Sequence, residues 1–266
     1  MILPTISVEK PWGRDSLPAP FTTGAGQRIG EIWFDPPPQL PQLLVKYIFT
    51  GEKLSVQVHP DDDQTQAAGL GRQGKSECWY VIDAEPDATL GIGFADHVTA
   101  EDMRAAALDG SIEKLLVWHP VQTGDFFYIP ANTVHAIGAG VSLIEVQQNS
   151  DITYRLYDYG RPRELHLDAG VAVASGTPYD MELFRHVPGH GTQRLVNGPH
   201  FILDRIDGEI PEMNARDYPA QLLVIPRTPG IRVGGVEVAV GECALAPAIG
   251  GVDIADGALC LLARPR

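Results

Sequence analysis

Cysteine is scarce in this chain of 266 residues, which contains only Cys78, Cys243 and Cys260. The three form no Cys-x-x-Cys pair and no even set, so the sequence gives no sign of a disulfide framework. No apolar run approaches the roughly 18 residues that a membrane span needs. The first ten residues also lack the basic and apolar regions of a secretory signal. We therefore expect a cytoplasmic protein with reduced thiols and no membrane segment.

The chain also contains few basic residues and few segments that favour a long helix. Lys and Arg number 20 against 34 Asp and Glu, a formal net charge of −14, which disfavours nucleic acid or an anionic membrane as a partner. The 28 Gly and 22 Pro residues favour short strands and turns over helices. Residues 99–118 are the one convincing helical region, where Thr99 and Asp102 match a capping box and Gly110 interrupts the helix. The sequence therefore predicts a mainly β protein with a short helical insert.

The most informative stretch is residues 51–60, with the sequence GEKLSVQVHP. It predicts a strand that follows a glycine turn and ends at Pro60, which has no N–H to donate. Side chains alternate between the two faces of a strand, so Gln57 and His59 point the same way. A single histidine is more often a hydrogen-bonded residue than a ligand, and the pairing with Gln57 is what favours a metal-binding interpretation.

Two further stretches supply matching donors. Residues 124–135 (GDFFYIPANTVH) predict a glycine turn, an apolar strand and a second turn that ends at His135. Residues 74–82 (GKSECWYVI) predict a strand with Lys75 and Glu77 on one face, and a buried Glu is costly unless it is paired or bound to a metal. Gln57, His59, Glu77 and His135 form an O, N, O, N donor set that suits Zn²⁺, and also Fe²⁺ or Mn²⁺.

Other residues leave two interpretations open. Arg155 lies within an apolar β-run, where it needs an anion: either Glu145 or Asp151, or a negatively charged substrate. Trp12 is either a core residue, which we favour, or a wall of a pocket.

The C-terminal part of the chain contains a faint repeat. Residues 241–248 (GECALAPA) copy the Gly-acid-x4-Pro-Ala pattern of residues 124–131. Eleven residues after Gly124 comes His135, whereas eleven residues after Gly241 comes Val252. The second copy keeps the turn without the ligand, so we expect a related β-barrel domain that serves structure rather than chemistry.

Taken together, these stretches resemble a known family. Gly-x5-Gln-x-His followed by Gly-x5-Pro-x-Asn-x2-His is similar to the paired signature of the cupin superfamily, with Gln57 in place of the usual first histidine. More narrowly, the chain resembles the short bacterial form of the type I phosphomannose (mannose-6-phosphate) isomerases. The segments that carry this resemblance are SVQVHPDD (55–62), GKSECWY (74–80), IPANTVHA (129–136), QNSDITYRLYD (148–158) and RELHLD (163–168).

The resemblance implies a fold and an activity. It implies a cupin jelly-roll domain over residues 1–175, with the helical insert at 99–118, and a smaller degenerate jelly roll over 176–266. It implies one Zn²⁺ per chain and interconversion of mannose 6-phosphate and fructose 6-phosphate through a cis-enediol. The implied metal ligands are Gln57, His59, Glu77 and His135, the implied catalytic residues are Arg155, Lys75 and Glu145, and the implied substrate-binding residues are Ser55 and Trp12.

Several alternatives stay open from the sequence. The catalytic base is a zinc-bound water, Glu145 or Lys75. The phosphate needs a basic patch, for which the candidates are Arg155, Arg161, Arg163, Lys75 and Lys53. A cupin dioxygenase is the first competing function, because two histidines and one glutamate approach an iron facial triad. A non-catalytic cupin that binds a sugar phosphate is the second.

Overall fold

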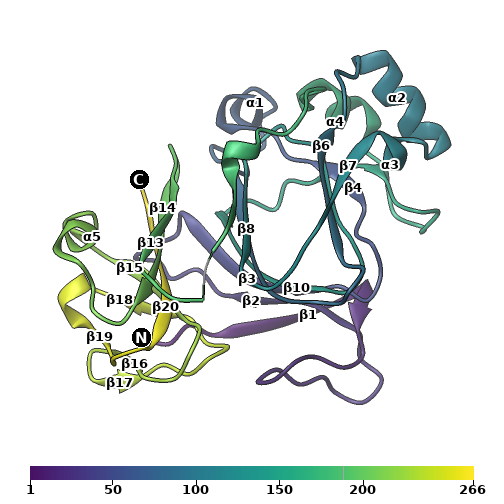
Figure 1. Cartoon of the computed structure of the whole chain (residues 1–266). Coiled ribbons are helices and arrows are strands. Elements are labelled where there is room, and N and C mark those ends of the chain that lie inside the picture. Colours follow the sequence, from purple (N-terminus) through teal and green to yellow (C-terminus); the bar gives the residue numbers. More distant parts are fainter. Residues whose placement is uncertain (188) are drawn as a thin grey trace.

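A computed structural model describes residues 1–187 and 189–266 and shows a mainly β protein (Figure 1). Its largest sheet is antiparallel and places β10 at the centre, between β3 and β5. In spatial order the described strands of this sheet are β1 (Thr5–Arg14), β2 (Ile29–Phe34), β3 (Leu43–Phe49), β10 (Val141–Gln148), β5 (Glu77–Ala84), β8 (Asp125–Ile129) and β12 (Phe184–His186). The central strands β3 and β10 are buried along their whole length, as expected for strands covered on both faces.

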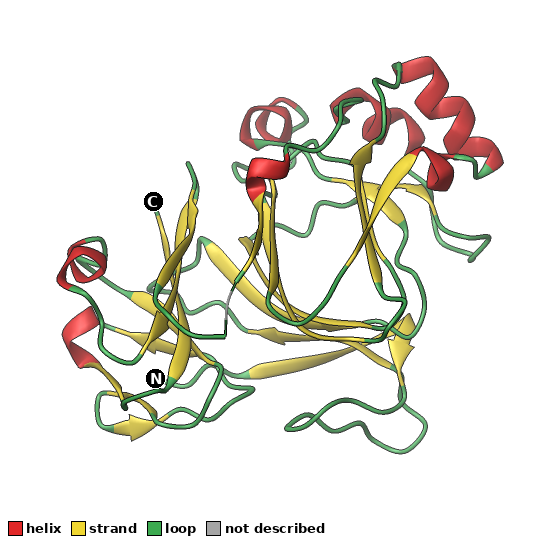
Figure 2. Cartoon of the chain, viewed as in Figure 1, coloured by secondary structure: helices red, strands yellow, loops and turns green. Residues whose placement is uncertain are grey.

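A second antiparallel sheet lies over the first and closes a barrel-like sandwich (Figure 2). Its strands, in spatial order, are β11 (Tyr154–Tyr157), β4 (Val56–Val58), β9 (His135–Ile137), β6 (Thr89–Phe94) and β7 (Leu116–Pro120). An apolar cluster that includes Trp79, Leu90, Phe127 and Leu143 fills one part of the space between the two sheets. The predicted mainly β fold, with a jelly-roll barrel, is confirmed.

Short helices cover one end of this barrel (Figure 1). They are α1 (Asp62–Ala67), α2 (Ala100–Asp109), α3 (Ile112–Leu115) and α4 (Leu167–Val173). Asp61 caps α1, and the predicted Thr99 cap of α2 is present, since its hydroxyl accepts a hydrogen bond from the backbone N–H of Asp102. The helical prediction was wrong for residues 116–118, which begin β7 because they pair with β6, in a register that includes Leu116 opposite Phe94.

The C-terminal strands form two further sheets beside the barrel (Figure 1). One contains β13 (Gln193–Asn197), β14 (Phe201–Asp207), β20 (Leu259–Pro265), β15 (Leu222–Pro226) and β18 (Ala244–Ala246). The other contains β17 (Val236–Glu237), β16 (Ile231–Val233) and β19 (Val252–Ile254). The remaining elements are α5 (Glu212–Arg216), η1 (Met181–Leu183) and η2 (Ile249–Gly251). The interior between these two sheets is an apolar cluster that includes Ile206, Val224, Val252 and Leu262.

The two parts of the molecule share one continuous apolar contact. Tyr47, Phe126 and Val146 of the large sheet belong to the same buried cluster as Phe201 and Leu261 of the C-terminal sheet. The change from one set of sheets to the other falls between β12 and β13, and the division at residue 175 stays a prediction. Within the described residues, no helix is long and apolar enough to cross a membrane.

Candidate metal centre

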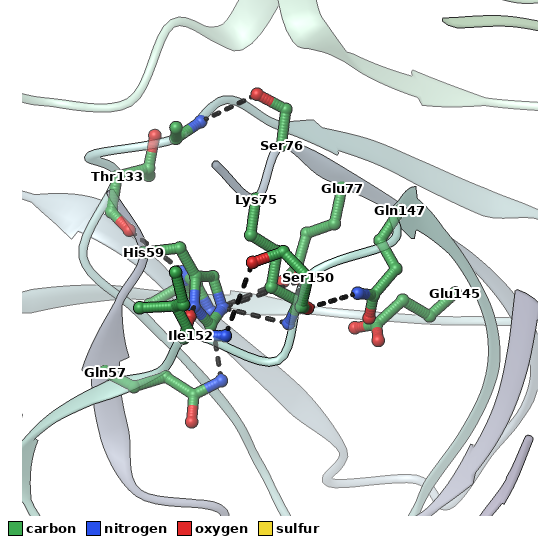
Figure 3. Close-up of polar contacts among 12 residues, drawn as sticks. Gln57, His59, Lys75, Ser76, Glu77, Thr133, Glu145, Gln147, Ser150 and Ile152 are labelled. Carbon is green, nitrogen blue, oxygen red and sulfur yellow. Dashed lines mark hydrogen bonds and ion pairs between the residues drawn. The ribbon is translucent and has the colours of Figure 1, made fainter. Parts of the chain in front are cut away.

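Neighbouring strands deliver the predicted donors to one place inside the barrel (Figure 3). Gln57 lies in the middle of β4 and pairs with His135, the first residue of β9. On its other side, β4 pairs with β11, where Arg155 lies opposite Gln57. His59 follows β4 directly, and Glu77 begins β5 on the facing sheet. The register of the two sheets therefore brings together side chains that are up to 78 residues apart in the sequence.

Three of these side chains form a compact donor set. Within the part of the chain that the structure describes, His59, Glu77 and His135 each offer one ligand atom, and these atoms lie within 4.8 Å of one another. Nε2 of His59 is 3.6 Å from Oε2 of Glu77, and Nε2 of His135 is 3.4 Å from Oε1. None of the three residues is more than 1% exposed. This set of two imidazoles and one carboxylate can hold one divalent metal ion.

Backbone carbonyls fix the orientation of both imidazoles. Nδ1 of His59 donates to the carbonyl of Ile152 at 2.8 Å, and Nδ1 of His135 donates to that of Thr133 at 2.9 Å. Each Nε2 is therefore left with a lone pair that faces Glu77, which is the arrangement of a metal-ligating histidine. Burial lowers the pKa of His135 to about 4 and that of His59 well below its usual value, so both rings are neutral near pH 7.

The Glu77 carboxylate fits a metal ligand because one of its oxygens has no donor in the protein. Oε1 has no hydrogen-bond partner among the described residues, whereas Oε2 lies 2.6 Å from the ammonium of Lys75. Burial, together with the charge of Glu145, raises the pKa of Glu77 to about 7. A buried carboxylate in this position is stabilised by a cation at the free side of the group, which a divalent metal ion supplies.

Gln57 lies beside the donor set and is the predicted fourth ligand. Its Nε2 donates toward Nε2 of His135 at 3.3 Å, and its Oε1 accepts a hydrogen bond from the hydroxyl of Ser55 at 3.2 Å. To offer its oxygen to a metal ion, the amide has to turn so that Oε1 replaces Nε2. Ser55 is the hydrogen-bond donor that this turn would release.

Lys75 lies within the same group of side chains. Its ammonium is 3.1 Å from Nε2 of His59 as well as in contact with Glu77. Burial opposes the charged form, but the Glu77 and Glu145 carboxylates outweigh burial and raise the pKa of Lys75. The donor set therefore already attracts one positive charge, which is consistent with a site for cations.

Glu145 is held as an ionised carboxylate by two donors. Its Oε2 accepts a hydrogen bond from Nε1 of Trp79 at 3.0 Å, and its Oε1 forms an ion pair with Nζ of Lys46 at 3.2 Å. Burial alone would raise the pKa of Glu145, but the charges of Lys75 and Lys46 lower it to about 2. Lys46 was not predicted from the sequence, although a lysine within the apolar strand β3 is a usable signal. The Lys46 ammonium also lies 4.6 Å from the centre of the Trp33 ring.

A cavity of about 420 Å³ lies beside the donor set, and Gln57 and Lys75, which both contact the donor set, line this cavity. Every predicted catalytic and substrate-binding residue lines it: Trp12, Ser55, Lys75, Glu145 and Arg155. Trp12 satisfies both interpretations left open by the sequence, because it is only 2% exposed, belongs to the apolar cluster beside the cavity and still forms part of its wall.

The structure separates the basic candidates for a phosphate. Arg155 and Arg163 line the cavity together with His166. Arg155 has no carboxylate partner among the described residues, and its guanidinium contacts only the carbonyl of Glu164, at 3.5 Å. Arg161 instead pairs with Asp158 and Glu52, each at 3.1 Å, outside the cavity lining.

The other basic residues of this region have carboxylate partners of their own. Lys53 pairs with Glu113 away from the cavity. Asp158 is 2.6 Å from Arg163 and holds that guanidinium at the cavity wall. A pair of Arg155 with Glu145 or Asp151, one of the two interpretations that the sequence left open, is not formed among the described residues.

Part of the chain is similar in sequence to curated mannose-6-phosphate isomerases. No protein-family model matches it. It is 45% identical over 137 residues to mannose-6-phosphate isomerase ManA of Bacillus subtilis (strain 168), covering 49% of this chain and 43% of that protein. It is 37% identical over 190 residues to a mannose-6-phosphate isomerase of Streptococcus mutans, covering 66% of this chain and 58% of that protein. The chain thus spans about half the length of the curated relatives it matches.

Solved structures match over nearly the whole chain. A mannose 6-phosphate isomerase from Bacillus subtilis superposes with a TM-score of 0.75 at 24% identity, covering 99% of this chain and 98% of that one. A zinc-bound mannose 6-phosphate isomerase superposes with a TM-score of 0.74 at 14% identity, covering 100% of this chain and 99% of that one. These matches show the shared fold, and with the curated relatives they confirm the resemblance to mannose-6-phosphate isomerases.

Proposed function

We propose that this chain is a metal-dependent aldose–ketose isomerase that interconverts mannose 6-phosphate and fructose 6-phosphate by proton transfer through a cis-enediol. The observation that carries the proposal is the convergence of the ligand atoms of His59, Glu77 and His135 within 4.8 Å, beside a cavity that Lys75, Glu145 and Arg155 line. The names of the curated relatives and of the structural neighbours support the same activity.

The metal we propose is one Zn²⁺ per chain, held by His59, Glu77 and His135 with Gln57 as the fourth donor. Two neutral imidazoles, a carboxylate and an amide oxygen match the donors that zinc accepts. The zinc-bound mannose 6-phosphate isomerase that shares this fold supports the same choice of metal. When bound, the ion supplies a Lewis acid that polarises or orients substrate oxygens.

The proton transfer requires groups that can donate and accept near C1 and C2 of the sugar. Lys75 is protonated, so it can donate a hydrogen bond or a proton to a substrate oxygen, including the ring oxygen during ring opening. Glu145 is ionised and fixed by Trp79 and Lys46, so it can only accept. We therefore propose Glu145 as the proton acceptor among the protein groups and Lys75 as the donor.

For the phosphate we propose the wall formed by Arg155 and Arg163, with His166 beside them. Arg163 is already oriented by the buried carboxylate of Asp158, whereas Arg155 has its guanidinium free to bind an anion. Burial and the neighbouring charge of Arg163 lower the pKa of Arg155, and an anion between the two guanidinium groups would relieve their repulsion. Arg155 is also suited to stabilise negative charge as it develops during the reaction.

Two further roles complete the site. We propose that Ser55 contacts the substrate when the Gln57 amide turns and frees the hydroxyl. We propose that Trp12 forms an apolar wall for the sugar carbons, since its buried ring lines the cavity and belongs to the neighbouring apolar cluster. A cytoplasmic location remains part of the proposal, supported by the three buried, unpaired cysteines.

The proposed function is tested by a coupled assay with mannose 6-phosphate, carried out before and after chelation and after return of Zn²⁺. We expect fructose 6-phosphate to form, to stop forming after chelation and to form again with the metal, with or without oxygen. Turnover that consumes O₂ would favour a cupin dioxygenase. Tight binding of mannose 6-phosphate without any turnover would favour a sugar-phosphate-binding protein.

A further inference from the structure

The loop at residues 149–153 has two contacts with the site. It follows β10, and its Ile152 carbonyl accepts the hydrogen bond that holds the Nδ1–H of His59 (Figure 3). Three of its residues, Ser150, Asp151 and Thr153, line the cavity. The path of this loop therefore decides both where Nε2 of His59 points and the shape of one cavity wall.

One buried side chain holds the start of this loop from inside the barrel. Gln147 is 0% exposed and lies opposite Glu77 in the pairing of β10 with β5. Its Nε2 donates to the carbonyl of Gln148 at 2.8 Å and to that of Ser150 at 2.9 Å, as Figure 3 shows for Ser150. Its Oε1 has no hydrogen-bond partner among the described residues.

Burying an amide in this way costs stability unless its groups are paired. At position 147 an apolar side chain would fill the same space without that cost, as Leu143 does on the same face of this strand. The pairing that Gln147 does achieve is made entirely with two carbonyls at the beginning of the loop. This arrangement indicates a role in setting the loop rather than in filling the core.

Further contacts hold the loop from within and from its outer side. Within the loop, the backbone N–H of Ser150 donates to the carbonyl of Gln148 at 2.8 Å, and the Ser150 hydroxyl accepts from the backbone N–H of Ile152 at 3.4 Å. The Asn149 side chain donates to the carbonyl of Pro41 at 2.9 Å, and its backbone N–H donates to that of Gln42 at 2.8 Å. These contacts fix the first residue of the loop to the segment that precedes β3. Among the described residues, the side chain that donates to the Ser150 carbonyl, two residues before Ile152, is that of Gln147.

We infer that Gln147 is a positioning residue of the metal centre. By holding the Ser150 carbonyl, it directs the loop so that the Ile152 carbonyl meets His59 and keeps Nε2 of that ring facing Glu77 and His135. The inference rests on the proposed metal-dependent function. Groups that orient a metal-ligating histidine commonly affect metal affinity by roughly 10- to 100-fold, and Gln147 acts one contact further away, so we expect the lower end of that range.

The test uses Gln147→Met, which keeps the length of the side chain and removes both donors. Binding of Co²⁺ and Zn²⁺ to the chelated full chain is measured by competition with a chromophoric chelator, together with the visible absorption spectrum of the Co²⁺ form. We expect about tenfold weaker binding and a changed Co²⁺ spectrum. Asn149→Ala, which removes one hydrogen bond of the same loop on its outer side, is expected to leave both unchanged.

The outcomes separate this inference from the proposed function. If the unmodified chain binds neither metal, the proposed metal-dependent function fails. If it binds them and Gln147→Met binds with the same affinity and the same spectrum, the inference is overturned, even if the variant is less stable to heat. Should Gln147→Met not fold, Gln147→Glu places a carboxylate against the same two carbonyls at similar size. Unchanged metal binding by Gln147→Glu would overturn the inference equally.

Discussion

The two β regions of this molecule differ most in what they bury. Between the two sheets of the barrel lie ionisable side chains that are almost completely buried: His59, Lys75, Glu77, His135 and Glu145. Between the two C-terminal sheets lies an apolar cluster, and the buried carboxylate of this region, Asp204, is paired with Arg194 at 2.6 Å. An apolar interior stabilises a fold directly, whereas buried charges cost stability unless they are paired. The difference is that the barrel gathers its buried ionisable groups around one candidate metal centre, whereas the C-terminal region pairs its buried carboxylate locally and fills the remaining space with apolar side chains.

A pair of matched turns shows the same contrast at single residues. Gly124 and Gly241 both have positive φ, 94° and 92°, and each is followed eleven residues later by the first residue of a strand. In the barrel that residue is His135, a member of the donor set, and in the C-terminal region it is Val252, a member of the apolar cluster. The same local structure therefore presents a ligand in one region and a packing group in the other.

Removing the ligand at the first of these positions should have the largest effect. His135→Ala deletes one of the two imidazoles, so we expect loss of the bound metal and of mannose 6-phosphate isomerisation. Metal content by elemental analysis and turnover by the coupled assay check this. A folded His135→Ala variant with full turnover would show that the donor set has no part in the reaction.

Arg155→Ala should separate catalysis from metal binding. The guanidinium lines the cavity but does not belong to the donor set, so we expect turnover to fall roughly 10²- to 10³-fold while the metal content stays the same. Steady-state kinetics with metal analysis of the same sample is the measurement. Normal turnover would remove Arg155 from the mechanism, and loss of metal would assign it a role in the centre itself.

Lys46→Met tests the cost of buried charge in the barrel. It leaves the Glu145 carboxylate without its ion pair, so we expect the metal-free chain to lose about 3–5 kcal/mol of unfolding free energy at pH 6. The pKa of Glu145 is lowered to about 2 in the folded chain, so its stabilising contribution is present above its usual pKa near 4.5 and is lost as the pH falls toward 2.

The difference between Lys46→Met and the unmodified chain should therefore shrink as the pH falls from 5 to 3. Denaturant unfolding of both chains across this range measures it. A difference that stays constant with pH would show that Lys46 does not stabilise the ionised form of Glu145.

Val252→Ala is the matched change in the C-terminal region and should have the smallest effect. It removes two methyl groups from an apolar cluster, which we expect to cost roughly 1–3 kcal/mol of unfolding free energy while metal content and turnover stay the same. Thermal unfolding and the coupled assay provide the comparison with His135→Ala. A loss of metal in Val252→Ala would contradict the division of roles between the two regions.

The sequence predicted the donors better than their surroundings. Strand alternation placed Gln57 and His59 on one face, and the turn before His135 marked the start of its strand. Lys46, Trp79 and Gln147 were missed because their roles depend on which strands pair, and β10 lies between β3 and β5 through contacts that no local pattern specifies. The helical prediction for residues 116–118 was wrong for the same reason, since pairing with β6 outweighed local helix propensity.

The most direct test of the metal centre is X-ray absorption spectroscopy at the zinc edge on the chain loaded with one equivalent of Zn²⁺. We predict a first shell of nitrogen and oxygen at about 2.0–2.2 Å with the outer-shell scattering of two imidazoles, and we predict that His135→Ala, loaded and desalted in the same way, retains no zinc in such a shell. A sulfur ligand at about 2.3 Å, or a shell unchanged by His135→Ala, would contradict the account.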